Sequence, residues 1–237
     1  MTAGQPLIRI AALTKAYQAL RPLRIADLSI GREDRLVLSG FDEGAAAMFV
    51  YLVTGAALPD EGHVHVAGRD TRDIATDTEW LTSLDRFGIV THRAVLLEGL
   101  SVAANLALPL TLSVDPMDDD VRARVTREAI EAGLRIDCLD GPVGALSHDD
   151  RLRLHLARAA VVGPELIMLE HPTQTLDQAG QSAAFGEALK ALSGRRGFGW
   201  IALSEDESFA KASGGTRLRL DPRTGRIQAG ATRWWSR

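Results

Sequence analysis

The sequence lacks several features that would place it in a class of protein at once. It has one cysteine in 237 residues, Cys138, which excludes an internal disulfide and suits a reducing compartment. It has no excess of positive charge, since 27 Lys and Arg stand against 31 Asp and Glu, a net charge of -4. A protein that holds nucleic acid mainly through its phosphates would be basic, so we expect no nucleic-acid partner.

Signals for export and for membrane insertion are also missing. The first six residues carry no signal-peptide pattern, so we expect the chain to stay in the cytoplasm. One apolar stretch, residues 95–114, contains Glu98, Asn105 and Pro109, which argue against a membrane span. We expect an apolar helix of a soluble protein there, with enough apolar surface to dock on a partner.

Two kinds of hydrophobic pattern alternate along the chain, which is typical of an α/β sheet protein. Strands with one buried face are predicted at residues 7–12, 23–30 and 63–67, and central parallel strands at 35–39, 165–169 and 200–204. Helices are predicted at residues 44–54, 118–133, 149–162 and 177–193. We find no internal repeat and no low-complexity linker, so we expect one domain over residues 1–237.

A strand, a glycine, a loop and a helix follow one another at residues 35–54 (RLVLSGFDEGAAAMFVYLVT). Their order and length are those of a phosphate-binding loop, whose pattern is G-x-x-x-x-G-K-[ST]. Gly40 is the first glycine, and Ala45, Ala46 and Ala47 stand at the second glycine, the lysine and the hydroxyl positions. The motif itself is not matched, so this interpretation depends on the rest of the chain.

Five further segments follow in a fixed order along the chain. They are LTKAY with Tyr17, FGIVTHRAVLLEGLSVAANLALPL at 87–110, LSHDDRLRLHLARA at 146–159, PELIMLEHPTQTLD at 164–177 and IALSED at 201–206. They resemble the adenine-stacking aromatic, the Q-loop, the signature helix, the Walker B strand with its D-loop, and the switch region of the ATP-binding cassettes of ABC transporters. The resemblance covers the whole chain.

The resemblance implies the architecture of an ABC cassette. This is an α/β, P-loop NTPase-like (RecA-like) core with an antiparallel β portion, which we expect at residues 1–87 and 163–237. A helical subdomain is expected at residues 88–162.

The resemblance also shows which functional positions have changed. In this family the loop lysine neutralises phosphate charge, the hydroxyl holds Mg²⁺, the Walker B Asp supports the metal and the following Glu polarises water. The residues at these positions, at the Q-loop glutamine and at the switch histidine are Ala46, Ala47, Glu170, His171, His92 and Glu205. We therefore expect no catalytic residue among them, and no cofactor.

The signature and the D-loop form the interface with a second cassette in this family. The signature keeps Leu146 and Ser147 but has His148, Asp149 and Asp150 in place of two glycines and a glutamine, while the D-loop keeps Asp177. The two carboxylates would meet the partner's triphosphate and repel it. Both composite sites are therefore expected to be damaged.

Two acidic residues in the loop decide whether Mg-ATP binds at all. Like charges about 4 Å apart repel by about 4 kcal/mol at an effective dielectric near 20. A helix N-terminus stabilises a bound anion by only about 0.3–2 kcal/mol. If Asp42 or Glu43 faces the loop, phosphate binding is excluded at physiological concentrations. If both face solvent, weak binding through Gly40, Gly44 and Tyr17 stays open, although Tyr17 is expected to be a packing residue.

Three smaller groups of residues each allow a structural and a functional interpretation. His92, Glu170, His171 and Glu205 would converge in such a fold and could hold Zn²⁺ or Mn²⁺, but a hydrogen-bonded plug is the favoured interpretation. His63 and His65 lie two apart on a strand and are expected to be an exposed pair rather than metal ligands. Trp234 and Trp235 end the chain, either as a frayed tail or as an anchor on a partner.

The functional hypothesis is a pseudo-ATPase cassette that completes or regulates a membrane transporter. The resemblance implies a transmembrane permease that docks at residues from His92 to Leu112, a second cassette as homodimer or heterodimer partner, and a place on the cytoplasmic face of the inner membrane. The phrase SVAANLALPL resembles cassettes of bacterial lipid and lipoprotein transporters. The alternatives are a nucleotide-sensing half of an asymmetric transporter, a soluble regulator with a His/Glu metal site, and ordinary ATP hydrolysis.

Overall fold

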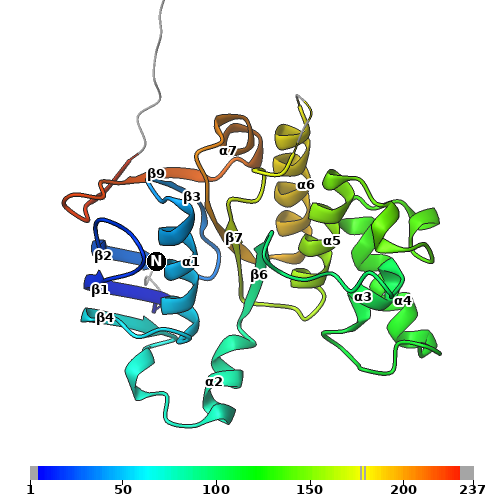
Figure 1. Ribbon diagram of the computed structural model, residues 1–237, viewed down its shortest axis with the longest axis horizontal. Helices are drawn as coiled ribbons and strands as arrows, with labels where there is room; N and C mark the ends of the chain where they lie inside the picture. The colour runs from blue at the N-terminus through cyan, green and yellow to red at the C-terminus, as the bar shows by residue number, and fades with distance from the viewer. Residues whose placement is uncertain (1–4, 177, 179, 230–237) are drawn as a thin grey trace, which may run out of the picture.

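The computed structural model describes residues 5–176, 178 and 180–229, which form two sheets with helices between and beside them (Figure 1). The smaller sheet is antiparallel and has the order β2-β1-β4-β5. Its strands are β1 (Ile8–Lys15), β2 (Leu23–Ile30), β4 (Glu61–Val66) and β5 (Arg69–Asp70). This sheet is the antiparallel portion that the sequence predicts near the N-terminus.

The larger sheet has the order β10-β9-β3-β8-β7-β6 and is parallel except for its β9–β10 pair. Its strands are β3 (Arg35–Ser39), β6 (Phe87–Thr91), β7 (Leu166–Glu170), β8 (Gly199–Leu203), β9 (Thr216–Leu220) and β10 (Ile227–Ala229). The three strands predicted to be central and parallel, β3, β8 and β7, lie side by side in the middle of this sheet. Strands β7 and β8 are buried along their whole length, as apolar runs covered on both faces should be.

Helix α1 (Glu43–Thr54) lies between the two sheets (Figure 1). Its Phe49 packs in one core with Ile8 of the smaller sheet and Met168 of the larger one. The opposite face of the larger sheet is covered by α5 (His148–Ala160), α6 (Gln181–Arg196) and α7 (Glu207–Ser213), where Trp200 and Phe209 are fully buried. The carboxyl ends of β3, β7 and β8 therefore open towards the N-terminus of α1.

The helical part forms a third core around α3 (Val102–Ala107), α4 (Asp119–Glu131) and α5, with Val125 and Leu154 fully buried. Helix α2 (Asp77–Leu84) and three short 3-10 helices complete the described elements: η1 (Thr71–Asp73), η2 (Ile136–Cys138) and η3 (Val143–Ala145). In the described ranges, the helices are all too short or too polar to cross a membrane.

Two boundaries differ from the sequence prediction. Residues 88–91 belong to strand β6 of the larger sheet, so the helical part begins after Thr91 and not at 88. Residues 95–114 are not one apolar helix, since only Val102–Ala107 is helical. The reason is Asn105, whose buried side chain bonds the backbone N–H and C=O of Leu97 at 2.8 and 3.0 Å and so fixes the preceding residues as a loop.

Candidate functional site

The loop between β3 and α1 begins at Gly40, where only glycine fits. Its φ is +92°, and a Cβ at this position would lie 2.2 Å from the carbonyl oxygen of Leu220. The chain therefore turns sharply at the end of β3 and directs the following N–H groups into the space before α1. The predicted turn at Gly40 is therefore present.

Asp42 is the N-cap of α1, and its carboxylate faces the loop. Its Oδ1 accepts the N–H of Ala45 at 2.7 Å, and its backbone oxygen accepts the N–H of Ala46 at 2.9 Å. The Tyr17 hydroxyl donates to the same carboxylate at 3.2 Å. The Asp42 carboxylate thus faces the loop and binds the N–H of Ala45, which is the first of the two alternatives that the sequence left open.

Glu205, in the loop after β8, supplies a second carboxylate. Its Oε1 accepts the N–H of Gly40 at 2.5 Å. Glu43 behaves differently, because its side chain is 65% exposed and pairs with Nε2 of His92 at 3.2 Å. Two carboxylates from different parts of the chain therefore bind the loop at Gly40 and at Ala45, while the third stands outside it.

The remaining loop positions supply packing and no charge. Ala46 is fully buried and Ala47 is partly buried, so neither a cation nor a hydroxyl is present at these positions. The ring of Tyr17 lies against Gly44, where an added Cβ would be 3.0 Å from Cε2 of the ring. Partial burial and the nearby charge and hydrogen bond of Asp42 raise the pKa of Tyr17. Tyr17 thus packs on the loop and holds its capping carboxylate.

Glu170 ends strand β7 and is fully buried. Its Oε2 accepts a bond from Nη2 of Arg93 at 2.6 Å, and Arg93 also donates to the Tyr51 hydroxyl at 2.6 Å, with its guanidinium 5.2 Å above the Tyr51 ring. Although burial acts the other way, Glu170 holds the pKa of Arg93 above its usual value. Sequence reasoning missed Arg93, and a cation directly after His92 is the signal that could have indicated a partner for Glu170.

The four residues with a proposed metal role do not form one cluster. Among the described residues there is no group of three or more His, Cys, Asp and Glu side chains that could hold a metal ion. His92 lies between Glu43 and the side-chain amide of Gln174, which is 3.1 Å from its Nδ1. His171 has a φ of +39°, and its buried Nε2 makes no hydrogen bond within the described residues. The described residues therefore give the His/Glu metal hypothesis no set of ligands.

Comparison with known proteins gives the family. The family model for "ABC transporter" matches residues 23–174 of this chain. The chain belongs to the ABC transporter family. The α1 loop, α5 and β7 follow one another in the order in which the sequence resemblance places the phosphate loop, the signature helix and the Walker B strand.

Similar proteins and structures agree on the cassette. The "Lipoprotein-releasing system ATP-binding protein LolD" of Alcanivorax borkumensis is 29% identical over 217 residues, 89% of this chain and 92% of that protein. A "Macrolide export ATP-binding/permease protein MacB" of Burkholderia cenocepacia is 30% identical over 177 residues, 73% of this chain but 26% of that protein. The chain thus spans about a quarter of this MacB relative. A solved structure, the "ATP-binding cassette MJ0796 bound to ADP and Pi", superimposes with a TM-score of 0.77 at 21% identity over 94% of this chain and 98% of that one, which supports the fold.

The signature of the cassette forms the N-terminus of α5. Ser147 is the N-cap, since its hydroxyl oxygen accepts the N–H of Asp150 at 3.1 Å and its O–H donates to the Asp150 carboxylate at 2.8 Å. Asp149 accepts from Nε of Arg153 at 2.8 Å, one turn further along the helix. Leu146 precedes the cap and packs on the helical core, and His148 is the first residue of the helix. Asp177 of the D-loop lies outside the described residues.

Two features of the loop before α1 stand against Mg-ATP. A triphosphate would need the N–H groups that Asp42 and Glu205 accept, and it would find no cation and no hydroxyl at Ala46 and Ala47. One feature would suit a cation, because Oε1 of Glu170 is buried and makes no hydrogen bond within the described residues. That oxygen alone does not make a metal site, since the other oxygen is bound to Arg93.

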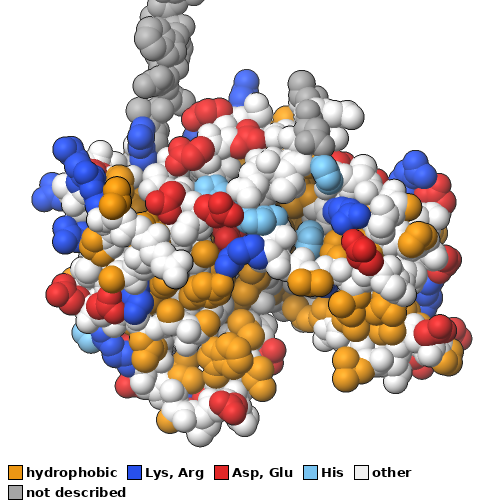
Figure 2. All heavy atoms as spheres, viewed as in Figure 1, with side chains coloured by type: hydrophobic (Ala, Val, Ile, Leu, Met, Phe, Trp, Pro, Cys, Tyr) orange, Lys and Arg blue, Asp and Glu red, His pale blue; other side chains and the backbone are white. Residues whose placement is uncertain are grey.

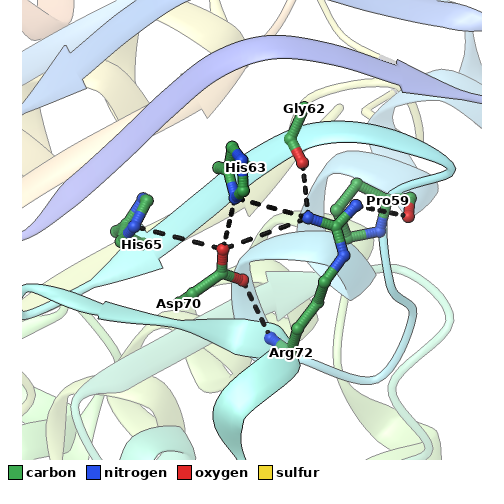
Figure 3. Close-up of polar contacts among 6 residues, drawn as sticks. All are labelled: Pro59, Gly62, His63, His65, Asp70 and Arg72. Carbon is green, nitrogen blue, oxygen red and sulfur yellow. Dashed lines mark hydrogen bonds and ion pairs between the residues drawn. The ribbon is translucent and has the colours of Figure 1, made fainter.

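His63 and His65 lie on one side of β4 and share one carboxylate, Asp70 of β5 (Figure 3). Nδ1 of His63 is 2.6 Å and Nε2 of His65 is 4.0 Å from Oδ2 of Asp70. Arg72 lies beside them, 3.4 Å from Nδ1 of His63, and donates to the carbonyl oxygens of Gly62 and Pro59. The pair is thus part of a hydrogen-bonded cluster at the edge of the smaller sheet. Trp234 and Trp235 lie outside the described residues.

Proposed function

We propose that this cassette is a pseudo-ATPase, which completes or regulates a membrane transporter assembly and has little or no ATP binding or hydrolysis of its own. One observation carries the proposal. Two backbone donors of the loop before α1 are bound to the chain's own carboxylates, the N–H of Ala45 to Asp42 and the N–H of Gly40 to Glu205. Phosphate oxygens would have to displace both of these side chains.

Electrostatics supports the same conclusion. A phosphate near either carboxylate would meet a repulsion of about 4 kcal/mol per pair of charges at 4 Å and an effective dielectric near 20. The dipole of α1 offers about 0.3–1 kcal/mol, and Asp42 already uses it. The lysine whose positive charge usually offsets such repulsion in a phosphate loop is replaced by Ala46.

The proposed partners are a transmembrane permease and a second cassette, at the cytoplasmic face of the inner membrane. The segment from His92 to Leu112, which is the proposed permease site, exposes Val95, Leu97 and Leu112. Exposed apolar side chains so close in sequence favour a protein partner over free solvent. The LolD relative is named for a lipoprotein-releasing system and the MacB relative for macrolide export, which favours a transporter as that partner.

The experiment is calorimetry of Mg-ATP with the native chain, three test variants and one control variant. The native chain should not bind at physiological concentrations. Asp42→Gly/Glu205→Gln frees the loop, Ala46→Lys/Ala47→Ser restores the cation and the hydroxyl, and the four changes together should restore binding. Glu43→Gln is the matched control, because it removes a charge from the same loop at a carboxylate that pairs with His92 and not with the loop.

The outcomes separate the proposal from its alternative. Micromolar binding by the native chain would favour the nucleotide-sensing half of an asymmetric transporter, and turnover that depends on Mg²⁺ would contradict both. Binding restored equally by Glu43→Gln would show that net loop charge, and not occupation of the N–H groups, closes the site.

A further inference from the structure

A pocket of about 550 Å³ lies between the loop after β6, the first half of α5 and the loop after β7. Its cationic and imidazole side chains are His92, Arg93, His148, Arg151 and His155, and its apolar lining includes Val90, Leu96, Leu152 and Pro172. Figure 2 shows histidine side chains gathered beside Lys or Arg side chains near the middle of the molecular face drawn there. The pocket shares no residue with the loop from Gly40 to Ala47.

The described lining of this pocket contains no acidic side chain. The charge of Arg93 is balanced by Glu170. Arg151 contacts the carbonyl oxygens of Leu146 and Gly144 at 3.4 and 3.5 Å, which are long and weak bonds. Its guanidinium therefore keeps donors for a stronger acceptor.

His155 is a neutral donor in the wall of the pocket. Its Nδ1 is 3.3 Å from Nη2 of Arg158, which can only donate. Burial first, and then the charges of Arg158 and Arg151, lower the pKa of His155 to about 4. The ring is therefore neutral at pH 7, with its proton on Nε2, and Arg151 is the charge of the lining that favours an anion.

We propose that this pocket binds a small organic anion, an apolar body with one carboxylate or phosphate group, whose charge is paired by Arg151 and whose body packs on Leu96, Leu152 and Pro172. The volume is within the range of about 300–1,000 Å³ for small-molecule pockets, and the combination of an apolar wall with few convergent polar groups is typical of them.

The test uses phenyl phosphate and benzoate as probes, with inorganic phosphate as the probe without an apolar body. Binding is measured by calorimetry, and the binding site is located by backbone amide shifts in NMR spectra. The native chain should bind phenyl phosphate or benzoate more tightly than inorganic phosphate, with shifts at residues 91–96 and 148–155. Which of the two binds more tightly identifies the anionic group.

Three variants make the test specific. Arg151→Gln should weaken binding by about tenfold or more, because a charge-assisted hydrogen bond is lost. Arg151→Lys should retain binding, since it keeps the charge and controls for a folding defect. Arg122→Gln, which removes an arginine paired with Asp140 on the same helical part, should bind as the native chain does.

Three results would overturn the inference. The first is a native chain that binds none of the probes, even if it binds an acidic peptide, because the occupant would then be a macromolecule. The second is equal weakening by Arg151→Gln and Arg122→Gln. The third is a set of shifts confined to residues 40–47, which would also contradict the closed phosphate loop, whereas the first two leave the proposed function untouched.

Discussion

The N-termini of α1 and α5 are both closed by the chain's own side chains, but in different ways. At α1 the cap is the carboxylate of Asp42, which Tyr17 holds from 25 residues away. At α5 the cap is the hydroxyl of Ser147, bound reciprocally to Asp150 three residues on. A helix end always leaves unsatisfied N–H groups, and a side-chain cap that satisfies them removes them from a ligand.

The two helix ends differ in how far apart in the sequence their hydrogen-bond partners lie. The α1 end is fixed by residues from three parts of the chain, because Tyr17 binds Asp42 and Glu205 binds Gly40, and the second half of α1 is joined through Tyr51 to Arg93 and Glu170. The α5 end is a local motif within one helical turn. Changes to the long-range pairs on the α1 side should therefore lower the free energy of unfolding more than changes to the charge pair within α5.

The largest effect is expected for Arg93→Met. It leaves Glu170, which is fully buried, without its ion-pair partner, and the free energy of unfolding should fall by about 3–5 kcal/mol. Urea unfolding at pH 7 measures it. The double variant Arg93→Met/Glu170→Gln should recover part of the loss, because the uncompensated charge is gone.

The α5 side provides the comparison for this effect. Asp149→Asn removes the charge of a pair within one helix, Asp149 with Arg153, and should lower the free energy of unfolding by about 0.5 kcal/mol. If Asp149→Asn lowered the free energy of unfolding as much as Arg93→Met does, the local pair would matter as much as the long-range pair, and the comparison would fail.

The two caps themselves should differ in their response to salt. Asp42→Ala and Ser147→Ala should each lower the free energy of unfolding by about 0.5–2 kcal/mol, because each loses an N-cap. High salt should reduce the loss for Asp42→Ala, whose charge interacts with the helix dipole, and should not change it for Ser147→Ala. Urea unfolding at low and high salt tests this. Asp42→Gly should cost only a few tenths of a kcal/mol, since glycine is an acceptable N-cap.

The sequence predicts the elements well where a strong pattern exists. The predicted ranges of β2 and β3 agree with the structure at both ends, and α5 agrees within two residues. The failure at the start of residues 95–114 comes from the bonds of Asn105 to the backbone of Leu97, which composition does not reveal. Hydrophobic periodicity indicates which face of an element is buried. It does not indicate which backbone group a buried side-chain amide binds.

The site is predicted less completely than the fold. Sequence spacing aligns Gly40, Ala46 and Glu170 with their motif positions, but leaves the direction of the Asp42 side chain open. That direction is set by the Ala45 N–H and by Tyr17, so it depends on the tertiary structure. Arg93 and Glu170 are 77 residues apart, and Glu205 is 165 residues from Gly40. Pairs so distant become visible only when the sheet is assembled.

The smallest expected effect is on the Tyr17 hydroxyl, and it tests the long-range part of the α1 network directly. Burial and the charge and hydrogen bond of Asp42 raise the pKa of Tyr17 above 10.0. The folded pKa is higher than the unfolded one, so this contribution to stability is complete below pH 10 and is lost as the pH rises through the folded pKa. The chain has two tyrosines, so absorbance titration of Tyr51→Phe reports Tyr17 alone.

Adding Asp42→Asn to that background isolates the contribution of the cap. The pKa of Tyr17 should fall towards its ordinary value and keep the part that burial causes, because the amide still caps α1 but carries no charge. Asp149→Asn at the other helix end should leave the titration unchanged. If Asp42→Asn also left it unchanged, Tyr17 would not sense the cap, and the α1 end would be as local as the α5 end.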